Sequence, residues 1–485
     1  MKTKISLLLN LLLISTLSFG AIHTVTNTNA DGDGSLAGVY EAAADGDTIA
    51  FNVDAESFTL PIAVDKGLTI DGLNQFNSSK MILKRDSISY ISIIGKTMTL
   101  KNLIFDGEGI AGEIGILADN TSTLNMESCI FKNISSASRA NNGSAARIQG
   151  IANINNCLFE NNVQGTGTYG GGAICIYNAA NVNIENSSFV GNKGQRGGAI
   201  NAHGTAAYSL TVTNTTFANN EAEGSSNARG GAVYLTAPTA LEVNAKFINC
   251  TFTGNYAKNN GGGLCAFASS GKKINIDMIN CIIAYNKTGN HSDIDVWNLG
   301  SRVFFNTATN CIYGTAAGGA AGIVWTNSIQ PADINLANIF RQTEDWVTGF
   351  IRPVLTDVSG QKIAAISETS IANAAGIATL AGFTIPGEDQ LGGERPTTPS
   401  IGAVEYYPSV GVSNAVNTEL KMTTKDKVIS FTGLSGVSPV AVYGLTGNLL
   451  HQSLAGNNQE ISLDHLSDNL VIVRINNKSF KAFLK

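Results

Sequence analysis

Two arginines occupy matching places in the sequence, each directly before a pair of glycines. Arg196 precedes Gly197–Gly198 and Arg229 precedes Gly230–Gly231, while Arg147 lies near an earlier pair. If these residues belong to copies of one repeat, stacked copies would bring Arg196 and Arg229 to about 5 Å from each other. A row of guanidinium groups could hold the carboxylate of a uronate sugar, so Arg196 and Arg229 are the candidates for catalysis. Because surface arginines are more often simply solvated, we do not expect this row to be an active site.

Other residues suited to polysaccharide cleavage are sparse. Such enzymes use paired carboxylates, or an acidic cluster that holds calcium. The charged residues within the repeats are expected not to stack on one another: Lys101, Glu127, Glu185, Lys246 and Asp277. His203, in the sequence NAHG, is interpreted as a turn residue. The sequence therefore predicts no cofactor, and calcium is expected only if the chain is an enzyme.

Seven cysteines and five histidines show no spacing that is typical of a metal site. Five cysteines share one slot of the repeat described below: Cys129, Cys157, Cys250, Cys281 and Cys311. Stacking in register would separate their Cβ atoms by about 4.8 Å, which is longer than a disulfide favours. Cys175 and Cys265 are expected three coils apart. We therefore predict buried free thiols and no metal site.

The composition favours a turn-rich β protein, and the N-terminal residues indicate export. Charged residues make up only 14% of the 485 residues and 52 residues are glycine, which suits turns and strands better than helices. The net charge of −6 argues against nucleic-acid binding, which usually leaves a basic footprint. Residues 1–20, with Lys2 and Lys4 before an apolar run, are typical of a signal peptide. No later apolar stretch is long enough for a transmembrane anchor.

A repeat explains why these residues recur. Each copy has a short strand of alternating apolar and polar residues, then Asn, a small residue, any residue, an aromatic, and a second Asn three residues after the aromatic. The first Asn, replaced once by Ser, recurs at intervals of 26 residues (Asn102 to Ser128) to 35 residues (Asn214 to Asn249). Its copies are Asn102, Ser128, Asn156, Asn186, Asn214, Asn249, Asn280 and Asn310. A period of this length indicates a solenoid, a propeller or an array.

The short strands and the Asn and Gly turns favour a parallel β-helix with three strands in each coil of about 28 residues. Stacked coils would align six rings into an internal ladder, which Ile283 and Tyr313 continue. These rings are Phe105, Phe131, Phe159, Phe189, Phe217 and Phe252. The Asn positions are expected at bends with left-handed backbone, and the Gly pairs where coils turn or approach closely. Ser35 is expected to begin a short helix that covers the open end of the solenoid.

Three motifs resemble known families. The Phe-x-x-Asn and Gly-Gly-Ala-Ile pairs are similar to the repeats of the polymorphic outer-membrane protein adhesins. The stretch from Thr24 to Phe51 resembles the opening of secreted proteins of the pectin-lyase-like β-helix superfamily. Residues 369–405 resemble the closing coil of the choice-of-anchor Q type, with Ser400 in place of the usual Asp. Together with the repeat, these resemblances predict an all-β chain with a right-handed parallel β-helix over residues 21–407.

The last part of the chain has a different pattern. After a linker at residues 408–413, residues 414–485 alternate strands with Gly turns and predict a small β-sandwich. The Val442–Gly447 hairpin, the Val471–Ile475 strand and the ending KAFLK resemble the type A C-terminal sorting domain of the type IX secretion system of Bacteroidetes. Residues 468–470 (DNL) replace its usual Gly-x-Tyr. The resemblance implies that this machinery is a partner, which delivers the protein through the periplasm to the cell surface or the medium.

The sequence leaves two functions open. The first is a non-catalytic adhesin or glycan-binding solenoid, with a polysaccharide or a host surface as its ligand. The second is a polysaccharide lyase or glycoside hydrolase, since the pectin-lyase-like superfamily that the chain resembles contains both. We favour binding, because the repeats show no paired carboxylates on neighbouring coils.

Overall fold

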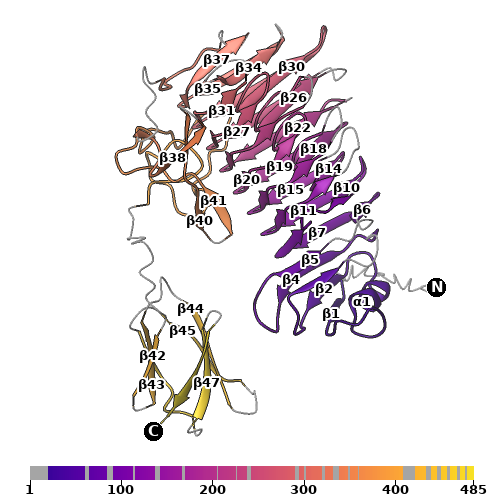
Figure 1. Cartoon of the computed structure of the whole chain (residues 1–485), viewed down its shortest axis with the longest axis vertical. Helices are drawn as coiled ribbons and strands as arrows, with labels where there is room; N and C mark the ends of the chain where they lie inside the picture. The colour runs from indigo at the N-terminus through magenta and orange to yellow at the C-terminus, as the bar shows by residue number, and fades with distance from the viewer. Residues whose placement is uncertain are drawn as a thin grey trace, which may run out of the picture. The chain divides into compact units, whose positions relative to one another are not determined.

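The structure is a computed structural model of the chain (Figure 1). It describes residues 20–484 except 60–64, 85–90, 113–114, 137–142, 166–169, 205, 225–226, 238–241, 290–293, 300–301, 319–322, 331–337, 348–349, 359, 408–420, 426, 433–437, 445–448, 456–458, 467–469 and 476–477. The chain divides into two compact units between Tyr406 and Tyr407. The predicted linker and all of the predicted signal peptide except Gly20 lie outside the described residues.

The first unit is a parallel β-helix, which confirms the predicted fold. In the described part of the chain, successive coils build four parallel sheets of 11, 10, 7 and 9 strands, here called sheets I to IV. Sheet I contains β1 (Ile22–Val25), β2 (Thr48–Phe51), β4 (Thr69–Asn74), β7 (Thr97–Lys101), β11 (Thr123–Glu127), β15 (Ile151–Asn155), β19 (Asn181–Glu185), β23 (Ser209–Thr213), β27 (Glu242–Ile248), β31 (Lys273–Ile279) and β35 (Val303–Thr309). Sheet II contains β3 (Ser57–Thr59), β5 (Met81–Lys84), β8 (Leu103–Asp106), β12 (Ile130–Lys132), β16 (Leu158–Glu160), β20 (Ser188–Val190), β24 (Thr216–Ala218), β28 (Thr251–Thr253), β32 (Ile282–Ile283) and β36 (Ile312–Tyr313).

The other two sheets complete each coil. Sheet III contains β9 (Ala111–Gly112), β13 (Ser135–Ser136), β17 (Val163–Gln164), β21 (Lys193–Gly194), β25 (Glu221–Ala222), β29 (Tyr256–Ala257) and β33 (Lys287–Thr288). Sheet IV contains β6 (Ile91–Ile93), β10 (Ile116–Ala118), β14 (Ala146–Ile148), β18 (Ile174–Tyr177), β22 (Ile200–His203), β26 (Val233–Ala237), β30 (Leu264–Ala268), β34 (Ile294–Leu299) and β37 (Thr315–Gly318). The prediction of three strands per coil is therefore wrong, because the segment after the second Asn of the repeat pairs with its copies to form the short strands of sheet III.

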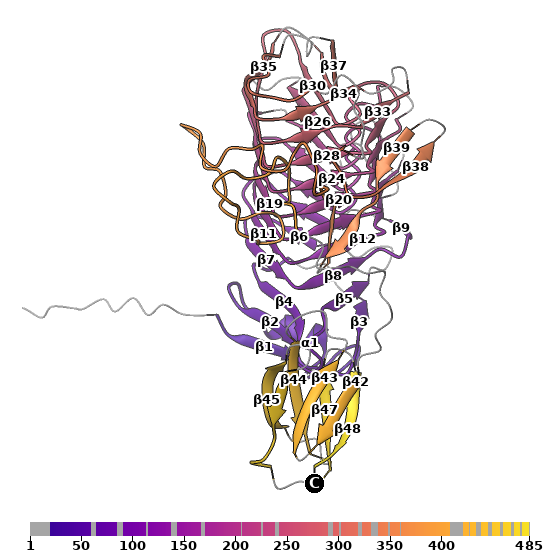
Figure 2. The ribbon, with the colours of Figure 1, turned by 90° about the vertical axis from the view of Figure 1, so that its left-hand side faces the viewer.

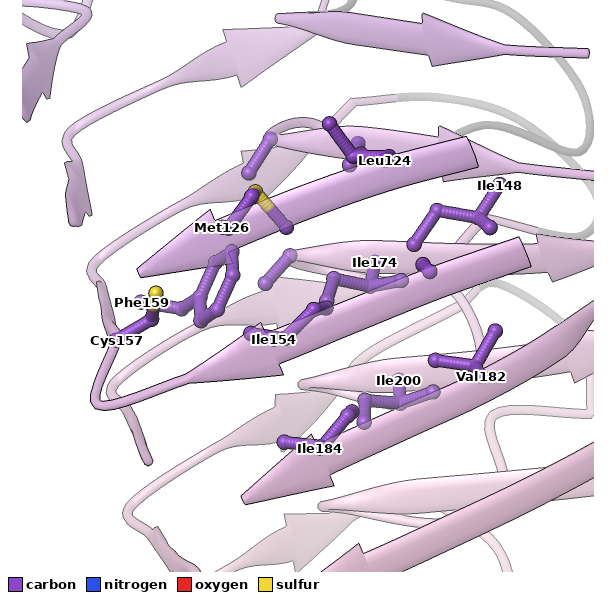
Figure 3. Packing of buried hydrophobic residues seen from close by; sticks show 14 of the residues in the cluster. Leu124, Met126, Ile148, Ile154, Cys157, Phe159, Ile174, Val182, Ile184 and Ile200 are labelled. Atoms are coloured by element: carbon purple, nitrogen blue, oxygen red, sulfur yellow. The ribbon is translucent and has the colours of Figure 1, made fainter. Parts of the chain in front are cut away.

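The predicted phenylalanine ladder is confirmed inside the solenoid. The six rings stack with centroids 4.6 to 5.0 Å apart and planes within 13° of parallel. Ile283 and Tyr313 continue the row in register, and the Tyr313 ring stacks on Trp325 with centroids 4.2 Å apart. Figure 3 shows Phe159 packed among aliphatic side chains from neighbouring coils. Offset stacking of this kind adds to the free energy gained from burying the rings.

The repeated asparagines form two hydrogen-bonded ladders. The first Asn of each described repeat has a positive φ between 46° and 53°, as the predicted left-handed bend requires. Its amide reaches the previous coil: Asn214 Nδ2 donates to Asn186 Oδ1 at 3.1 Å. The second Asn is fully buried, and its amide donates to its copy in the next coil, for example from Asn162 Nδ2 to Asn192 Oδ1 at 2.9 Å. These bonds satisfy polar groups that would otherwise be costly to bury.

The glycine pairs lie where the chain turns and where neighbouring coils approach closely, as predicted. Gly197 and Gly230, the first members of two pairs, have φ angles of 64° and 67°. The second members pack directly against the next coil, since a Cβ on Gly198 would lie 2.0 Å from the carbonyl oxygen of Gly231. Any larger residue at these second positions would force neighbouring coils apart.

The N-terminal end is covered by helix α1 (Leu36–Ala42). The Ser35 side chain accepts a hydrogen bond from the Gly38 N–H, which confirms it as the N-cap. Leu36, Val39 and Tyr40 of the helix are buried in the same core as the first coils. The helix therefore shields the first coil, as solenoid ends require.

The end of the first unit differs from the sequence prediction. Residues 338–406, here called the strap, do not form a closing coil but lie along the outside of sheet II (Figures 1 and 2). The strap contains two antiparallel hairpins, β38 (Thr343–Val347) with β39 (Phe350–Pro353), and β40 (Thr356–Val358) with β41 (Gln361–Ile363). Outward-facing apolar residues of sheet II are buried beneath it, among them Ile282 and Ile312. Burial of this apolar surface explains why the strap folds back instead of continuing the stack.

The cysteines are buried and free, as predicted. The cysteines that share a repeat slot form no disulfides with one another. Their thiols contact backbone oxygens instead; Cys129 Sγ, for example, lies 3.4 Å from Leu100 O. Cys175 and Cys265 occupy one row of sheet IV, three coils apart. Burial raises the pKa of Cys175 and of Cys265 to about 12, so both thiols stay protonated.

Thiol titration is expected to find most of the seven cysteines reactive after denaturation without reductant, and few of them reactive in the native protein. The physical reason is that the stacked thiols are buried and too far apart for relaxed disulfides. The same titration after reduction supplies the reference count of seven. Three disulfides in the unreduced protein would show that the alignment of these coils is wrong.

The second unit is a small β-sandwich, in agreement with the sequence. One sheet contains β42 (Lys421–Lys425), β43 (Val428–Thr432) and β46 (Glu460–Ser462). The other contains β45 (Leu449–Ala455), β44 (Ser438–Tyr443), β47 (Leu470–Ile475) and β48 (Lys478–Phe483). All described pairings are antiparallel, and residues such as Phe431 and Val473 share one core. This core is separate from that of the solenoid.

Candidate functional site

The two candidate arginines lie at equivalent positions of neighbouring coils, as their place before the Gly pairs predicts. The Gly197 N–H donates to the Arg229 carbonyl oxygen at 2.9 Å, and the Arg196 N–H donates to Gly170 O at 3.2 Å. Each guanidinium lies over an aromatic ring of the next coil of sheet IV. Arg196 Cζ is 5.9 Å from the centre of the Tyr234 ring, and Arg229 Cζ is 5.9 Å from that of Phe267.

The surroundings of these arginines resemble packing more than a reactive centre. Arg147 repeats the arrangement over Tyr177 at 4.8 Å, so the cation–π contact recurs along sheet IV. Tyr234 is only 1% exposed, and burial raises its pKa, which keeps the phenol protonated at neutral pH. His203 is the last residue of β22 rather than a turn residue, so that interpretation is wrong. Burial and the nearby Arg196 lower the pKa of His203, which favours its uncharged form.

The charged residues of sheet I stack in register, contrary to the sequence prediction. Lys101 pairs with Glu127 across β7 and β11, and their side chains form an ion pair of 2.9 Å. Lys246 likewise lies in register with Asp277 on the next strand. This stacking could have been predicted from the sequence, because Lys101, Glu127 and Glu185 each stand directly before the first Asn or Ser of the repeat.

A cleft of about 810 Å³ lies between the outer face of sheet I and the strap. Its floor is built from outward-facing residues of three adjacent strands: Glu185 of β19, Thr211 and Thr213 of β23, and Lys246 and Ile248 of β27. The register brings them together, since Glu185 pairs with Thr213 and Thr211 pairs with Lys246. Alternation along each strand directs these residues outward, while Ile184 and Val212 enter the core.

The strap forms the wall of the cleft. Residues 382–384 and 386–388, together with Gly392 and Glu394, line it. Glu388 and Glu394 are bridge partners in a short hairpin. Within that hairpin, the buried Asp389 carboxylate accepts hydrogen bonds from the Leu391 and Gly393 N–H groups at 2.9 and 3.0 Å. The hairpin therefore holds its two glutamates at the cleft in a fixed arrangement.

An aromatic ring completes the wall. Phe383 lines the cleft, and the Lys246 ammonium lies over its ring at 5.6 Å from the centre. The cleft also extends toward earlier coils. A smaller adjoining cleft of about 290 Å³ shares Asn186 and Gly392 with it and reaches Asn155. The combined groove crosses the coils of β15, β19, β23 and β27, a length that suits an extended ligand.

Arg395 joins the last residues of the strap to one another and reaches the solenoid at Asn214, beneath this groove. Its guanidinium pairs with Glu405 at 2.5 Å, and both side chains are at least 91% buried. It also donates to the carbonyl oxygens of Gly402 and Ala403 and to the Asn214 side chain. The Glu405 carboxylate accepts a further hydrogen bond from the Ser400 N–H at 2.9 Å. A buried pair satisfied in this way is expensive to break by removing one partner.

Gln390 of the strap forms a second attachment to the solenoid. Gln390 Nε2 donates to Ser188 Oγ at 2.7 Å, and Thr216 Oγ1 donates to Gln390 Oε1 at 2.6 Å. These bonds join residues about 174 to 202 positions apart in the chain. Sequence reasoning missed Phe383, Glu388 and Glu394 because only this long-range docking brings them to sheet I.

Among the described residues, no group of three or more His, Cys, Asp or Glu side chains is placed to hold a metal ion. Over the same residues, no helix has the length and the apolar character needed to cross a membrane.

A comparison with protein-family models and a comparison with curated protein sequences found no match. Among solved structures, the chain is similar to the crystal structure of the pectate lyase Pel9A, with 14% sequence identity and a TM-score of 0.31. The alignment covers 81% of this chain and 98% of the other. A similarity of this size assigns neither the activity nor the substrate of that enzyme to this chain.

Proposed function

We propose that this chain is an exported cell-surface or secreted protein whose β-helix binds a glycan without chemical change, as an adhesin or glycan-binding solenoid. The groove between sheet I and the strap carries the proposal. Its floor and turns present hydroxyl and amide groups, which suit the many hydroxyls of a saccharide: Thr211, Thr213 and Asn186. The Phe383 ring supplies an apolar face on which a sugar ring can stack.

The binding proposal predicts that the Phe383→Ala variant loses at least tenfold in affinity for the ligand, since about 1.4 kcal/mol of contact free energy corresponds to a factor of ten. The mature chain, residues 21–485, is first applied to an array of host, plant and bacterial glycans, and the best ligand is then titrated against both proteins. Phe304→Ala is the matched control, because Phe304 is also exposed beneath a lysine, with Lys273 Nζ 5.5 Å from its ring, but lies outside the cleft. Equal losses in the two variants, or an array without any bound glycan, would count against the cleft.

The resemblance of the tail to a type IX sorting domain supports the proposed export route. Deleting residues 414–485 is expected to leave the protein in the periplasm with its solenoid folded, since the two units have separate cores. Cell fractionation and surface labelling follow the location of the protein, and protease resistance of the solenoid reports its folding. The matched experiment fuses residues 408–485 to an unrelated periplasmic protein, which should then reach the surface. Unchanged surface display after the deletion would contradict the proposed route.

A polysaccharide lyase or glycoside hydrolase is the second candidate function. One observation favours it: Glu185, Glu388, Glu394 and Lys246 line the same cleft, whereas the sequence suggested no meeting of carboxylates. Carboxylates that flank a sugar can act as acid and base. Incubation with calcium and pectate, alginate, chondroitin or heparin, followed through unsaturated products and reducing ends, tests it. Turnover that disappears in Glu388→Gln or Glu394→Gln would place catalysis in the cleft, and turnover lost in Arg196→Ala or Arg229→Ala would place it at the arginine row.

A further inference from the structure

The charges of the cleft are unbalanced. Three carboxylates line it, those of Glu185, Glu388 and Glu394, against one ammonium group, that of Lys246, which leaves two net negative charges. Within the described part of the chain, no basic side chain forms an ion pair with any of these three glutamates. The nearby Arg395 is committed to Glu405 within the strap. The carboxylates therefore remain available to a ligand.

The single cation of the cleft is also partly compensated. Lys246 lies over the Phe383 ring, and Asp277 is its in-register neighbour on the next strand. Thr211, its neighbour on the other side, is uncharged. An acidic ligand would thus meet three carboxylates and one ammonium group that already interacts with Phe383 and neighbours Asp277.

We infer that the cleft takes saccharides that carry free amino groups and rejects polyuronates and sulfated glycans, an inference that rests on the proposed glycan-binding function. Each ligand ammonium group can donate charge-assisted hydrogen bonds to a cleft carboxylate. An ammonium group can also lie over the Phe383 ring in the manner of Lys246. A uronate brought to the same place is repelled, and screening does not remove the effect at contact distance, because the Debye length is about 8 Å at physiological salt.

The test compares ligands that differ only in the amino group. Glucosamine oligomers and the N-acetylated oligomers of equal length are titrated calorimetrically against the mature chain, with galacturonate oligomers as the acidic arm. The free-amine oligomers are expected to bind about tenfold more tightly than the acetylated ones, equivalent to one charge-assisted contact of about 1.4 kcal/mol. The difference should shrink as salt is added, and the galacturonate oligomers should not bind.

Substitutions of charged residues in the cleft test whether its negative charge selects free amines. Glu388→Gln and Glu394→Gln should each reduce the preference for free amines, while Lys246→Met should increase it. Glu223→Gln is the matched control, since Glu223 is an exposed glutamate of the same solenoid that does not line the cleft. Equal binding of free and acetylated oligomers, or tighter binding of galacturonate, would overturn the inference and leave glycan binding standing. A chain that binds no glycan on the array would instead overturn the proposed function itself.

Discussion

Phe189→Ala is expected to lower the free energy of unfolding of the solenoid by roughly 3–5 kcal/mol, the range for truncating a fully buried aromatic. The Phe189 ring stacks on Phe159 and on Phe217, with centroids 4.6 and 5.0 Å away, and has no exposed surface. Its loss leaves a cavity between two rings that the close-packed coils on either side cannot easily fill. Urea denaturation followed by circular dichroism measures the change.

The matched control is Phe76→Ala, because Phe76 belongs to the same solenoid but is half exposed. A surface substitution of this kind is expected to change the free energy by no more than about 0.5 kcal/mol. Since repeat proteins can unfold in parts, hydrogen exchange should accompany the denaturation curve. A loss below about 1 kcal/mol for Phe189→Ala would contradict the role of the ladder as the core of the coils.

Arg395→Met is the second substitution for which we expect a large effect, a destabilisation of about 3–5 kcal/mol of the strap. The methionine leaves the Glu405 carboxylate buried without its cation. It also removes the donor to the carbonyl oxygens of Gly402 and Ala403. Because these partners all belong to the strap or its docking site, faster hydrogen exchange and proteolysis should concentrate in residues 388–405.

Two control variants show whether the effect of Arg395→Met comes from leaving a buried charge unpaired. Arg352→Met removes an exposed pair with Glu344 in the same strap, which should contribute at most about 1 kcal/mol. The double variant Arg395→Met with Glu405→Leu removes both charges and should recover part of the lost stability. If Arg395→Met left exchange in residues 388–405 unchanged, the ion pair would not be what holds this part of the strap together.

The repeat allowed most of the solenoid to be predicted, because each ladder position is a local requirement that recurs. Asn186 must bend left-handed, Phe189 must fill the interior and Gly198 must admit the next coil, and each requirement selects one residue type. Ser35 was recognisable as a cap for the same reason. The number of strands per coil was not predicted, since the two-residue strands of sheet III carry no hydrophobic alternation.

The candidate site was much less predictable. Arg196 and Arg229 were correctly placed on neighbouring coils, because their positions follow from the Gly pairs. The cleft depends instead on where the strap docks, and this is decided by single side chains such as Gln390 and Arg395 that match no repeat. The motif at residues 400–405 resembles the end of a closing coil over residues 369–405, yet its Glu405 forms a buried ion pair outside the stack.

The buried asparagine ladder bears on how such a chain can change in length. In the series Asn162, Asn192, Asn220, Asn255 and Asn286, each of the first four side chains donates its amide to the next one in the series. Deleting the Asn192 side chain, for example, would leave the buried Asn162 backbone N–H without its acceptor and would remove one of the two acceptors of the Asn162 amide, at a cost of about 1–3 kcal/mol for each group left unsatisfied. Removing or duplicating a whole coil would leave every amide bonded. Gene duplication and deletion can therefore add or remove whole coils, rather than single residues of this row, while every amide of the ladder keeps its hydrogen bonds.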